Sequence, residues 1–432
     1  MNPNHIVFFT QLYYPDTTTT AIIMTDLVED LAAYGMNAEV VCAQPTYIKN
    51  SDPQTRLPLR GTSGQVTQIK IGKSADLRKS PRIECHNGVS IRRVWSFLFD
   101  KNKNIGRILN SVSCFLSMLP AVFSTGKNDV LVFNTNPAIL PFLGVISKKV
   151  RNQQYVILVH DLWPELPAHT GMIRKGGVLY RIIDFLITLS LRYASGIIVL
   201  SNAMKKHVLH KLPGTAHNIY VIHNWADANR IFPVAKENIR MINVLGLKNK
   251  KIVMYSGNLG RYQPLEVMID TANELRGRKD VLFLFVGNGG KRAKIQNMAE
   301  DLKLDNVKFL PFQPLDRLSE SLSMADVSLM GIYPENEGVI MPSKLYGLLA
   351  VGRPIICVSD PKSEVADILE QAGAGIQSSI NDPKELANNI LAIVDDQEKA
   401  REMGQNGRTY FLEHFERKII TKQWNDMLSN LT

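Results

Sequence analysis

A lysine stands where an apolar helical run begins. Lys344 directly precedes Leu345–Ala350, a run typical of a buried helix. A positive charge near a helix N-terminus opposes the helix dipole, so this placement is unfavourable unless an anion is present, and a diphosphate would supply one. Upstream, Glu337 can accept hydrogen bonds from sugar hydroxyls, and Gly338 lets backbone approach a ligand. Residues 335–354 therefore predict a nucleotide-sugar pocket, although a capped surface helix with incidental charges gives a similar pattern.

Two glycine-rich turns follow strand-like segments in the same half of the chain. In the first, Gly257 and Asn258 would let backbone N–H groups approach a phosphate, and Arg261 could grip a phosphate oxygen; the alternative is a tight turn with a surface arginine. The second turn, Gly-Asn-Gly-Gly, opens at Gly287. It lacks the spacing of the dinucleotide fingerprint, and no acidic residue follows where a ribose would be bound. We expect a glycine turn with some nucleotide contact rather than an NAD site.

A polar cluster ends the predicted strand at 155–159. His160 and Asp161 follow that strand directly, in the segment His-Asp-Leu-Trp-Pro-Glu. Side chains at the carboxyl end of a parallel strand point towards the ligand edge of the sheet. His160 or Asp161 could therefore handle an acceptor proton or stabilise positive charge at a reacting sugar carbon, although a lone histidine is usually structural. The other side chains expected on this acceptor side are Thr17, Thr18, Trp163 and Glu165.

Neither a metal nor another cofactor is predicted. No Asp-x-Asp motif occurs to clamp a diphosphate through a metal ion, so Lys344, Arg261 and backbone amides would have to hold it. The cysteines form no Cys-x-x-Cys pair, which argues against a zinc site or a disulfide framework and fits a reducing compartment. The four cysteines are Cys42, Cys85, Cys114 and Cys357.

Short apolar strands alternate with helical segments along the chain, and this rhythm predicts parallel sheets with helical crossovers. The predicted fold is α/β, with two successive doubly wound, Rossmann-like domains whose ligand edges face a common cleft. A polar, basic stretch at 50–87 predicts a long loop, and residues 408–431 predict one long amphipathic helix that packs back on the first domain. The predicted strands are 5–10, 38–43, 89–94, 129–133, 154–159, 196–200, 251–255, 281–286, 307–309, 327–330 and 354–358.

Five motifs together resemble glycosyltransferase family 4, of GT-B fold, over nearly the whole chain. They are HDLWPE at 160–165, VLSNAM at 199–204, VIHNWAD at 221–227, SGNLGR at 256–261 and PSKLYGLLAVGRP at 342–354. The resemblance implies an acceptor-side domain at 1–228, a nucleotide-sugar domain at 229–407 and a returning helix at 408–432. It further implies a retaining, metal-independent transfer from a UDP- or GDP-sugar. The acceptor would be a polyprenyl-diphosphate-linked saccharide in bacterial O-antigen (lipopolysaccharide), capsule or exopolysaccharide synthesis.

The resemblance assigns roles to single residues. Arg261 and Lys344 would bind the diphosphate, and His160 or Asp161 would lie near the reacting carbon. The remaining donor-binding residues that it implies are Gly257, Asn258, Gly287, Glu337, Gly338, Pro342 and Ser343. Three departures from the family pattern stand out. Gly347 occupies the place of a ribose-binding glutamate, no basic residue follows Arg261 until Arg276, and threonines replace a glycine pair after the first strand.

The net charge of +10 is concentrated in the first half of the chain. Residues 1–230 hold 25 Lys and Arg against 14 Asp and Glu, a net of +11, whereas the remainder nets −1. Such a field attracts polyanions or simply keeps a surface solvated. The segments 105–123 and 174–193 combine basic and apolar residues, as interfacial helices do, but ordinary core helices would also fit. With no signal peptide evident, we expect a cytoplasmic enzyme, peripheral on the inner face of the inner membrane.

Two other functional classes are compatible with parts of this pattern. A sugar-nucleotide 2-epimerase would share the architecture, but the segments at 160–165 and 342–344 argue against it. A nucleic-acid-binding protein is suggested by charge alone. The basic stretch has no interleaved aromatic residues and no recognisable nucleic-acid module, so no nucleic-acid partner is expected.

Overall fold

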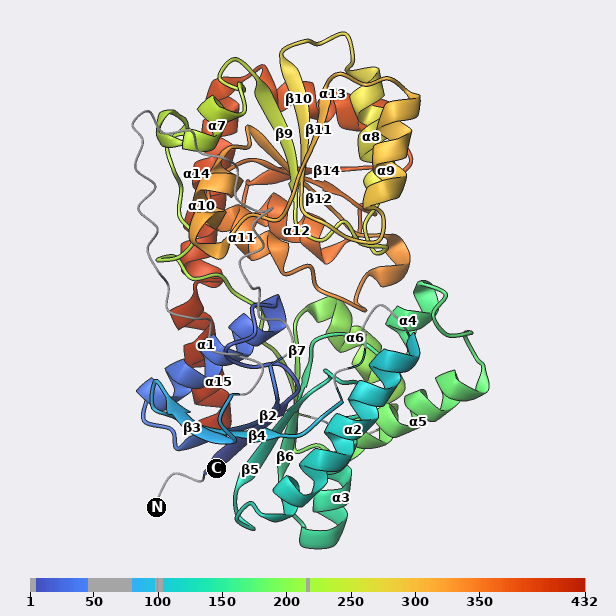
Figure 1. Ribbon diagram of the computed structural model, residues 1–432, viewed down its shortest axis with the longest axis vertical. Helices are drawn as coiled ribbons and strands as arrows, with labels where there is room; N and C mark the ends of the chain where they lie inside the picture. The colour runs from blue at the N-terminus through green and yellow to red at the C-terminus, as the bar shows by residue number, and fades with distance from the viewer. Residues whose placement is uncertain (1–4, 46–79, 98, 100–103, 215–217, 432) are drawn as a thin grey trace. The chain divides into compact units, whose positions relative to one another are not determined.

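The protein forms two units, each built around one twisted β-sheet (Figure 1). The structure is a computed structural model that describes residues 5–45, 80–97, 99, 104–214 and 218–431. The first unit comprises residues 1–200, 207–222 and 421–432, and the second comprises 201–206 and 223–420. The chain thus divides after Ile222, whereas the sequence suggested a boundary after residue 228, and it returns to the first unit at its C-terminal end.

The sheet of the first unit has the strand order β3-β4-β2-β1-β5-β6-β7-β8. All neighbouring strands are parallel except β3, which runs antiparallel to β4. The central strands are buried throughout, as expected of a parallel sheet covered on both faces. The strands are β1 Ile6–Thr10, β2 Ala38–Ala43, β3 Ile83–His86, β4 Val89–Val94, β5 Val130–Asn134, β6 Tyr155–Val159, β7 Gly196–Val199 and β8 Ile219–Val221.

Helices pack on this sheet in two groups. Helix α3 contacts both α2 and α5, so these three helices form one layer, while α1 packs against β2 and β4 (Figure 1). Thr18 caps α1 by accepting a hydrogen bond from the Ala21 N–H. The helices are α1 Thr19–Ala33, α2 Asn104–Phe123, α3 Phe142–Arg151, α4 Glu165–His169, α5 Val178–Tyr193, α6 Asn202–Lys211 and α15 Arg417–Ser429.

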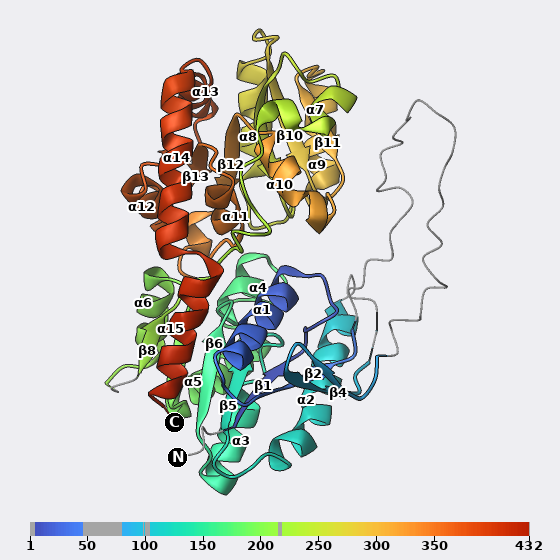
Figure 2. The same ribbon diagram turned by 90° about the vertical axis from the view of Figure 1, so that its left-hand side faces the viewer.

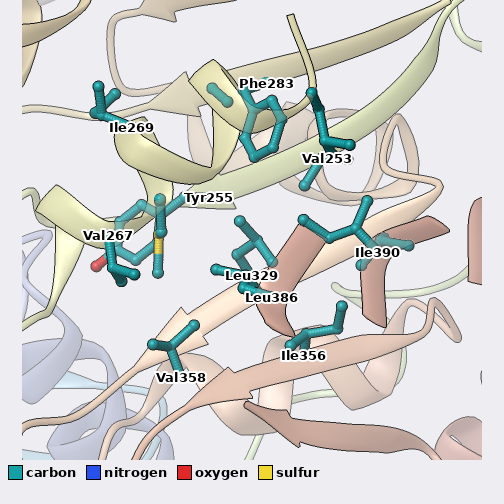
Figure 3. Packing of buried hydrophobic residues seen from close by; sticks show 14 of the residues in the cluster. Val253, Tyr255, Val267, Ile269, Phe283, Leu329, Ile356, Val358, Leu386 and Ile390 are labelled. Carbon is teal, nitrogen blue, oxygen red and sulfur yellow. The ribbon is translucent and has the colours of Figure 1, made fainter. Parts of the chain in front are cut away.

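The second unit has a wholly parallel sheet of order β11-β10-β9-β12-β13-β14. Its core joins strand residues such as Phe283 and Leu329 to Val267 of α8 and Ile390 of α13 (Figure 3). The strands are β9 Lys251–Ser256, β10 Val281–Val286, β11 Val307–Leu310, β12 Val327–Gly331, β13 Ile355–Val358 and β14 Gly375–Ser378. The helices are α7 Arg240–Val244, α8 Leu265–Glu274, α9 Arg292–Asp301, α10 Leu318–Ser323, α11 Lys344–Ala350, α12 Glu364–Gln371, α13 Pro383–Val394 and α14 Gln397–His414.

The predicted α/β class is confirmed, but the loop expected at 50–87 contains a strand. Its residues 50–79 lie outside the described part of the chain, whereas 83–86 form β3. β3 pairs with β4 through a two-residue turn in which Asn87 and Gly88 both have positive φ. Asn-Gly is the preferred dipeptide of such hairpins, so the sequence did carry this signal. The short strands β8 and β14 were also not predicted.

The single final helix expected at 408–431 is wrong. Two helices, α14 and α15, are separated at Phe415, whose backbone is not helical (Figure 2). The interruption has a cause in hydrogen bonding. The Ala226 N–H donates to the Phe415 carbonyl, and the Arg417 N–H donates to the Ala226 carbonyl. This strand-like pairing with a distant residue takes the place of two helical hydrogen bonds, which no local periodicity could reveal.

Candidate functional site

In the second unit, the turns after β9 and β10 pack backbone against backbone. The Gly257 N–H donates to the Val286 carbonyl, and the Leu259 N–H donates to the Asn288 carbonyl. A Cβ atom at Gly287 would lie 1.9 Å from the Gly257 carbonyl oxygen, and both glycines have positive φ. No side chain fits at Gly287. The two glycine turns predicted as separate features therefore form one platform.

Lys344 lies against this platform with its charge unpaired. Its Nζ atom is buried, has no hydrogen-bond partner and lies 3.6 Å from the centre of the Tyr255 ring. A Cβ atom placed on Gly257 would be only 3.3 Å from that Nζ. Burial lowers the pKa of Lys344 to about 7. A desolvated ammonium group beside an open glycine backbone provides one half of an anion site.

Arg261 and Asn258 line the outer part of the platform. The Arg261 side chain is exposed, and its Nε is 3.9 Å from the Cβ position of Gly290, so it lies beside the second turn. The Asn258 side chain lies within 3 Å of the Cβ positions of both Gly260 and Gly289. The Asn258 backbone carbonyl accepts a hydrogen bond from the Tyr255 hydroxyl. Lys344 and Arg261 thus approach the platform from a buried and an exposed side.

Glu337 forms hydrogen bonds within the protein that the sequence did not predict. Its carboxylate accepts hydrogen bonds from the Glu364 N–H and the Ser363 hydroxyl, each at 2.9 Å, and so binds the first turn of α12. Burial raises the pKa of Glu337, in opposition to these two hydrogen bonds. Gly338 follows with a φ of 68°, which reverses the chain immediately after the carboxylate. Any sugar contact of Glu337 must use the remaining lone pairs of its oxygens.

The start of α11 brings the remaining predicted donor residues together. The Leu345 N–H donates to the Pro342 carbonyl, and Ser343 directly precedes the helix without a side-chain capping bond. At Gly347, where the family pattern has a glutamate, a Cβ atom would meet only the Cδ1 atoms of Ile231 and Leu322, at 3.7 and 3.8 Å. Among the described residues, the immediate neighbours of this Cβ position are thus apolar.

A half-buried ion pair beside the platform was not predicted from the sequence. The Lys291 ammonium donates to the Glu266 carboxylate, the Gln263 carbonyl and the Tyr333 hydroxyl at 2.8–2.9 Å. It therefore joins the segments that follow β9, β10 and β12. Burial alone would raise the pKa of Glu266, but hydrogen bonds from Lys291 and Lys294 outweigh it and lower the pKa to about 2. The signal available was the lysine directly after the second glycine turn.

In the first unit, Thr135 holds the predicted catalytic pair. The Thr135 hydroxyl oxygen accepts hydrogen bonds from the His160 and Asp161 N–H groups at 3.1 and 3.4 Å, which fixes the turn after β6. Burial lowers the pKa of His160 to about 4, so the imidazole is neutral at pH 7, and its Nε2 has no partner. Burial raises the pKa of Asp161 to about 6. Thr135 itself was not predicted.

The other residues predicted on the acceptor side differ in whether they line a pocket or have structural partners. Asp161 and Trp163 line a small, mostly apolar pocket together with Leu191 of α5. The Glu165 carboxylate pairs with Lys211, which also pairs with Asp184. These ion pairs connect helices α4, α5 and α6. Thr17 is exposed, and the Thr18 hydroxyl is engaged in capping α1. Of these side chains, Asp161 and Trp163 therefore share a pocket, whereas Thr18 and Glu165 have structural partners.

The described residues offer neither a cluster of metal ligands nor a membrane-spanning helix. These residues contain no group of three or more His, Cys, Asp and Glu side chains placed to hold a metal ion. None of the helices in the described ranges combines the length and apolarity needed to cross a bilayer.

Comparison with known proteins assigns both halves of the chain to one enzyme class. The family model described as "Glycosyltransferase Family 4" matches residues 65–230, and "Glycosyl transferases group 1" matches residues 238–410. The "Probable glycosyltransferase WbjE" of Pseudomonas aeruginosa is 27% identical over 297 residues, covering 68% of this chain and 74% of that protein. The "Putative colanic acid biosynthesis glycosyl transferase WcaI" of Escherichia coli is 25% identical over 364 residues, covering 83% and 84%.

The fold has a solved counterpart with a nucleotide bound. Anabaena Alr3699/HepE, solved in complex with UDP and glucose, superimposes with a TM-score of 0.70 and 16% identity. The match covers 99% of this chain and 100% of that one. At this identity the likeness supports the two-sheet fold and nothing finer.

Proposed function

The chain belongs to glycosyltransferase family 4 and has the GT-B fold, and from this premise we propose a specific reaction for it. The enzyme moves a sugar from a UDP- or GDP-sugar, with retention of configuration and without a metal ion. The acceptor is a polyprenyl-diphosphate-linked saccharide in bacterial surface polysaccharide synthesis. The product class rests on the names of the relatives, one of which refers to colanic acid biosynthesis.

The observation that carries the proposal is the unpaired ammonium of Lys344 above Gly257. A buried cation without a hydrogen-bond acceptor is costly, and an anionic ligand removes that cost. The exposed guanidinium of Arg261, beside the second glycine turn, adds further donors around the same place. A diphosphate has the charge and the several oxygens to engage all of them. As the sugar–phosphate bond breaks, these groups stabilise the growing negative charge of the leaving diphosphate without a metal.

The acceptor would meet the turn after β6. The acceptor hydroxyl must lose its proton as its oxygen bonds to the sugar carbon. A neutral His160 with an unpaired Nε2, or an ionised Asp161, can accept that proton or stabilise positive charge at the carbon. The Thr135 hydroxyl holds the backbone N–H groups of both residues, so the turn that carries these side chains is formed before the substrate binds.

A lipid-linked acceptor requires the enzyme to work at a membrane surface. Helix α5 supports this part of the proposal, since Val178 is 78% exposed and Phe185 is 64% exposed. The exposed Arg174, Lys175 and Arg181 lie at the same end of α5. Apolar side chains next to arginine and lysine suit the interface of a bilayer with anionic headgroups. We place the enzyme in the cytoplasm, peripheral on the inner face of the inner membrane.

Donor binding tests the core of the proposal. Calorimetric titration with UDP, GDP, ADP and dTDP should identify one nucleotide, and Lys344→Ala should weaken its binding by roughly 1.5–3 kcal/mol, the range for a charged hydrogen bond. Lys279→Ala is the matched control, because Lys279 is 71% exposed and pairs with Asp305 at the surface. Equal affinity of the wild type and Lys344→Ala would refute the assignment. Conversion of a sugar nucleotide without any acceptor would instead indicate a 2-epimerase.

A further inference from the structure

Three aromatic rings project from the chain directly after β4. Trp95, Phe97 and Phe99 are 60%, 40% and 46% exposed, whereas Ser96 between the first two is buried. The ring centres of Trp95 and Phe97 are 4.6 Å apart, and those of Phe97 and Phe99 are 5.0 Å apart. The exposed rings at 95 and 97 with buried Ser96 between them follow the alternation of an extended strand. The three rings, called here the aromatic ladder, form a continuous apolar edge.

Helix α2 holds this ladder in place with buried polar side chains. The Phe97 N–H donates to the Ser113 hydroxyl oxygen, and the Phe99 N–H donates to the Asn110 side-chain oxygen, both at 2.9 Å. The Asn110 amide also donates to the Phe99 carbonyl at 3.0 Å. Asn110 and Ser113 are 3% and 6% exposed. Two buried polar side chains thus form the backbone hydrogen bonds of this segment while its three rings stay exposed. The fold itself therefore holds the rings in their exposed positions.

Helix α2, which holds the ladder, also carries exposed apolar side chains. Ile108, Leu109, Val112 and Leu116 are 40–58% exposed and recur at helical spacing. Residues 108–126 contain no charged residue. A surface helix normally carries charged or polar residues on its outer face, so an uncharged and apolar one indicates a partner.

Positive charge lies at one end of this apolar surface. At the C-terminal end of α2, Arg151 donates to the carbonyls of Phe123 and Thr125, and Arg92 donates to the Ser124 hydroxyl. Lys127 follows and is exposed. The charge therefore complements an anionic surface, and the apolar side chains complement a hydrocarbon boundary.

We propose that the aromatic ladder and the outer side of α2 insert into the interface of an anionic lipid bilayer. Aromatic rings, tryptophan above all, favour the headgroup region, where an amphipathic ring meets both water and acyl chains. The uncharged stripe of α2 would lie in the interface with its axis in the membrane plane. This inference deepens the proposed function by naming residues that dock the enzyme beside its lipid-linked acceptor. The aromatic ladder and α2 are separate from the exposed apolar and basic side chains of α5 described above.

Vesicle flotation of the full chain tests the inference. The vesicles contain phosphatidylcholine with about one third phosphatidylglycerol, and pure phosphatidylcholine serves as the uncharged reference. The triple variant Trp95→Ser, Phe97→Ser, Phe99→Ser should bind the anionic vesicles at least about tenfold more weakly, since three apolar rings no longer leave water. The matched control is Leu315→Ser with Leu412→Ser, because these side chains are 55% and 42% exposed on the second unit. Unchanged melting temperatures show that both variants fold.

Tryptophan fluorescence locates the inserted side chain independently. The chain has four tryptophans, and Trp95 is far more exposed than Trp225 and Trp424, at 7% and 1%. Lipids brominated near the glycerol backbone should quench the wild type, and Trp95→Phe should lose most of that quenching while it still binds. Absence of quenching in the wild type would overturn the inference.

Other outcomes separate this inference from the proposed function. Nucleotide affinity and transfer to a water-soluble acceptor should be the same in the triple variant and the wild type. If the triple variant floats with vesicles as the wild type does, the ladder is not the docking element, whether or not the enzyme transfers sugar. If light scattering shows a wild-type dimer that the triple variant abolishes, the surface is an interface between two copies and the inference fails. Loss of donor binding in Lys344→Ala concerns only the proposed function.

Discussion

The ammonium of Lys344 lies 3.6 Å from the centre of the Tyr255 ring and has no hydrogen-bond acceptor. Tyr255 ends the buried part of β9, and Lys344 begins α11, so the contact joins the two elements that carry the donor platform. The ring face stabilises the cation in part, but it does not replace an anion. The Tyr255 ring therefore stabilises the Lys344 ammonium only in part, and the group retains its full capacity to donate hydrogen bonds to an anion.

Donor binding should take up a proton at alkaline pH. Burial lowers the pKa of Lys344 to about 7, so much of the free protein is unprotonated at pH 8, whereas a bound diphosphate favours the protonated form. Calorimetry in buffers of different ionisation enthalpy should show nearly one proton taken up near pH 8.5, and the donor affinity should fall as the pH rises above 7. Lys344→Met should abolish the uptake. A proton uptake that persists in this variant would assign the titration to another group.

The same lysine should affect the pH dependence of stability in the absence of donor. The folded pKa is depressed below the ordinary value of 10.5, so the folded chain binds fewer protons than the unfolded chain between about pH 7 and 10.5. The contribution of Lys344 to the free energy of unfolding should therefore rise with pH across this window. Denaturant titrations at a series of pH values give the free energy of unfolding of the wild type and of Lys344→Met. Plotted against pH, the two free energies should have different slopes between about pH 7 and 10.5 and the same slope below pH 6.

Gly287→Ala should destabilise the second unit strongly. The added Cβ would lie 1.9 Å from the Gly257 carbonyl oxygen at a φ of 141°, and neither turn can move without losing hydrogen bonds between them. We expect a loss of about 2–4 kcal/mol in the free energy of unfolding, the range for a severe local clash. Gly277→Ala is the matched control, since nothing lies within 4 Å of its Cβ position, and it should be nearly neutral. Similar unfolding midpoints for both variants would contradict the interlocked turns.

Lys291→Met should weaken donor binding because it loosens the loops around the platform, and not because a phosphate contact is lost. Its ammonium already holds Glu266, Gln263 and Tyr333, so its removal frees three segments around the platform. We expect donor affinity to fall roughly three- to thirtyfold, the effect of a lost buried charged hydrogen bond. Lys294→Met should do little, because Lys294 is 62% exposed and pairs only with the other oxygen of Glu266. Equal effects of the two substitutions would show that the loop connections do not matter.

Asp161→Asn and His160→Ala should lower the turnover number and leave nucleotide affinity unchanged. If ionised Asp161 accepts the acceptor proton, the rate should rise with pH through about 6, the raised pKa of this carboxyl, and Asp161→Asn should remove that rise. His160 has its pKa near 4 and should give no inflection between pH 5.5 and 8. A wild-type rate that is flat through pH 6 would exclude Asp161 as the proton acceptor.

Local patterns in the sequence were sufficient for most of the strands and for the family. Buried parallel strands leave continuous apolar runs such as 281–286, and the motifs around 160–165 and 342–354 are short and contiguous. The features that escaped prediction depend on distant partners. Phe415 interrupts the last helix because Ala226 pairs with its backbone, and Glu337 binds a helix that begins 27 residues later. Lys344 was predicted from the helix dipole, whereas its burial is what leaves it without an acceptor.

The interlocked glycine turns limit how this enzyme can be redesigned or can diverge. A side chain at position 287 would displace the turn at 257, and one at position 257 would strain a φ of 133° and crowd the Lys344 ammonium. Variation that alters the choice of nucleotide must then fall on residues around the platform, such as the exposed Asn258 and Phe312, whose ring lies 3.4 Å from the Cβ position of Gly287. A mutational library for a new donor specificity would therefore vary positions 258 and 312 and keep both glycines constant.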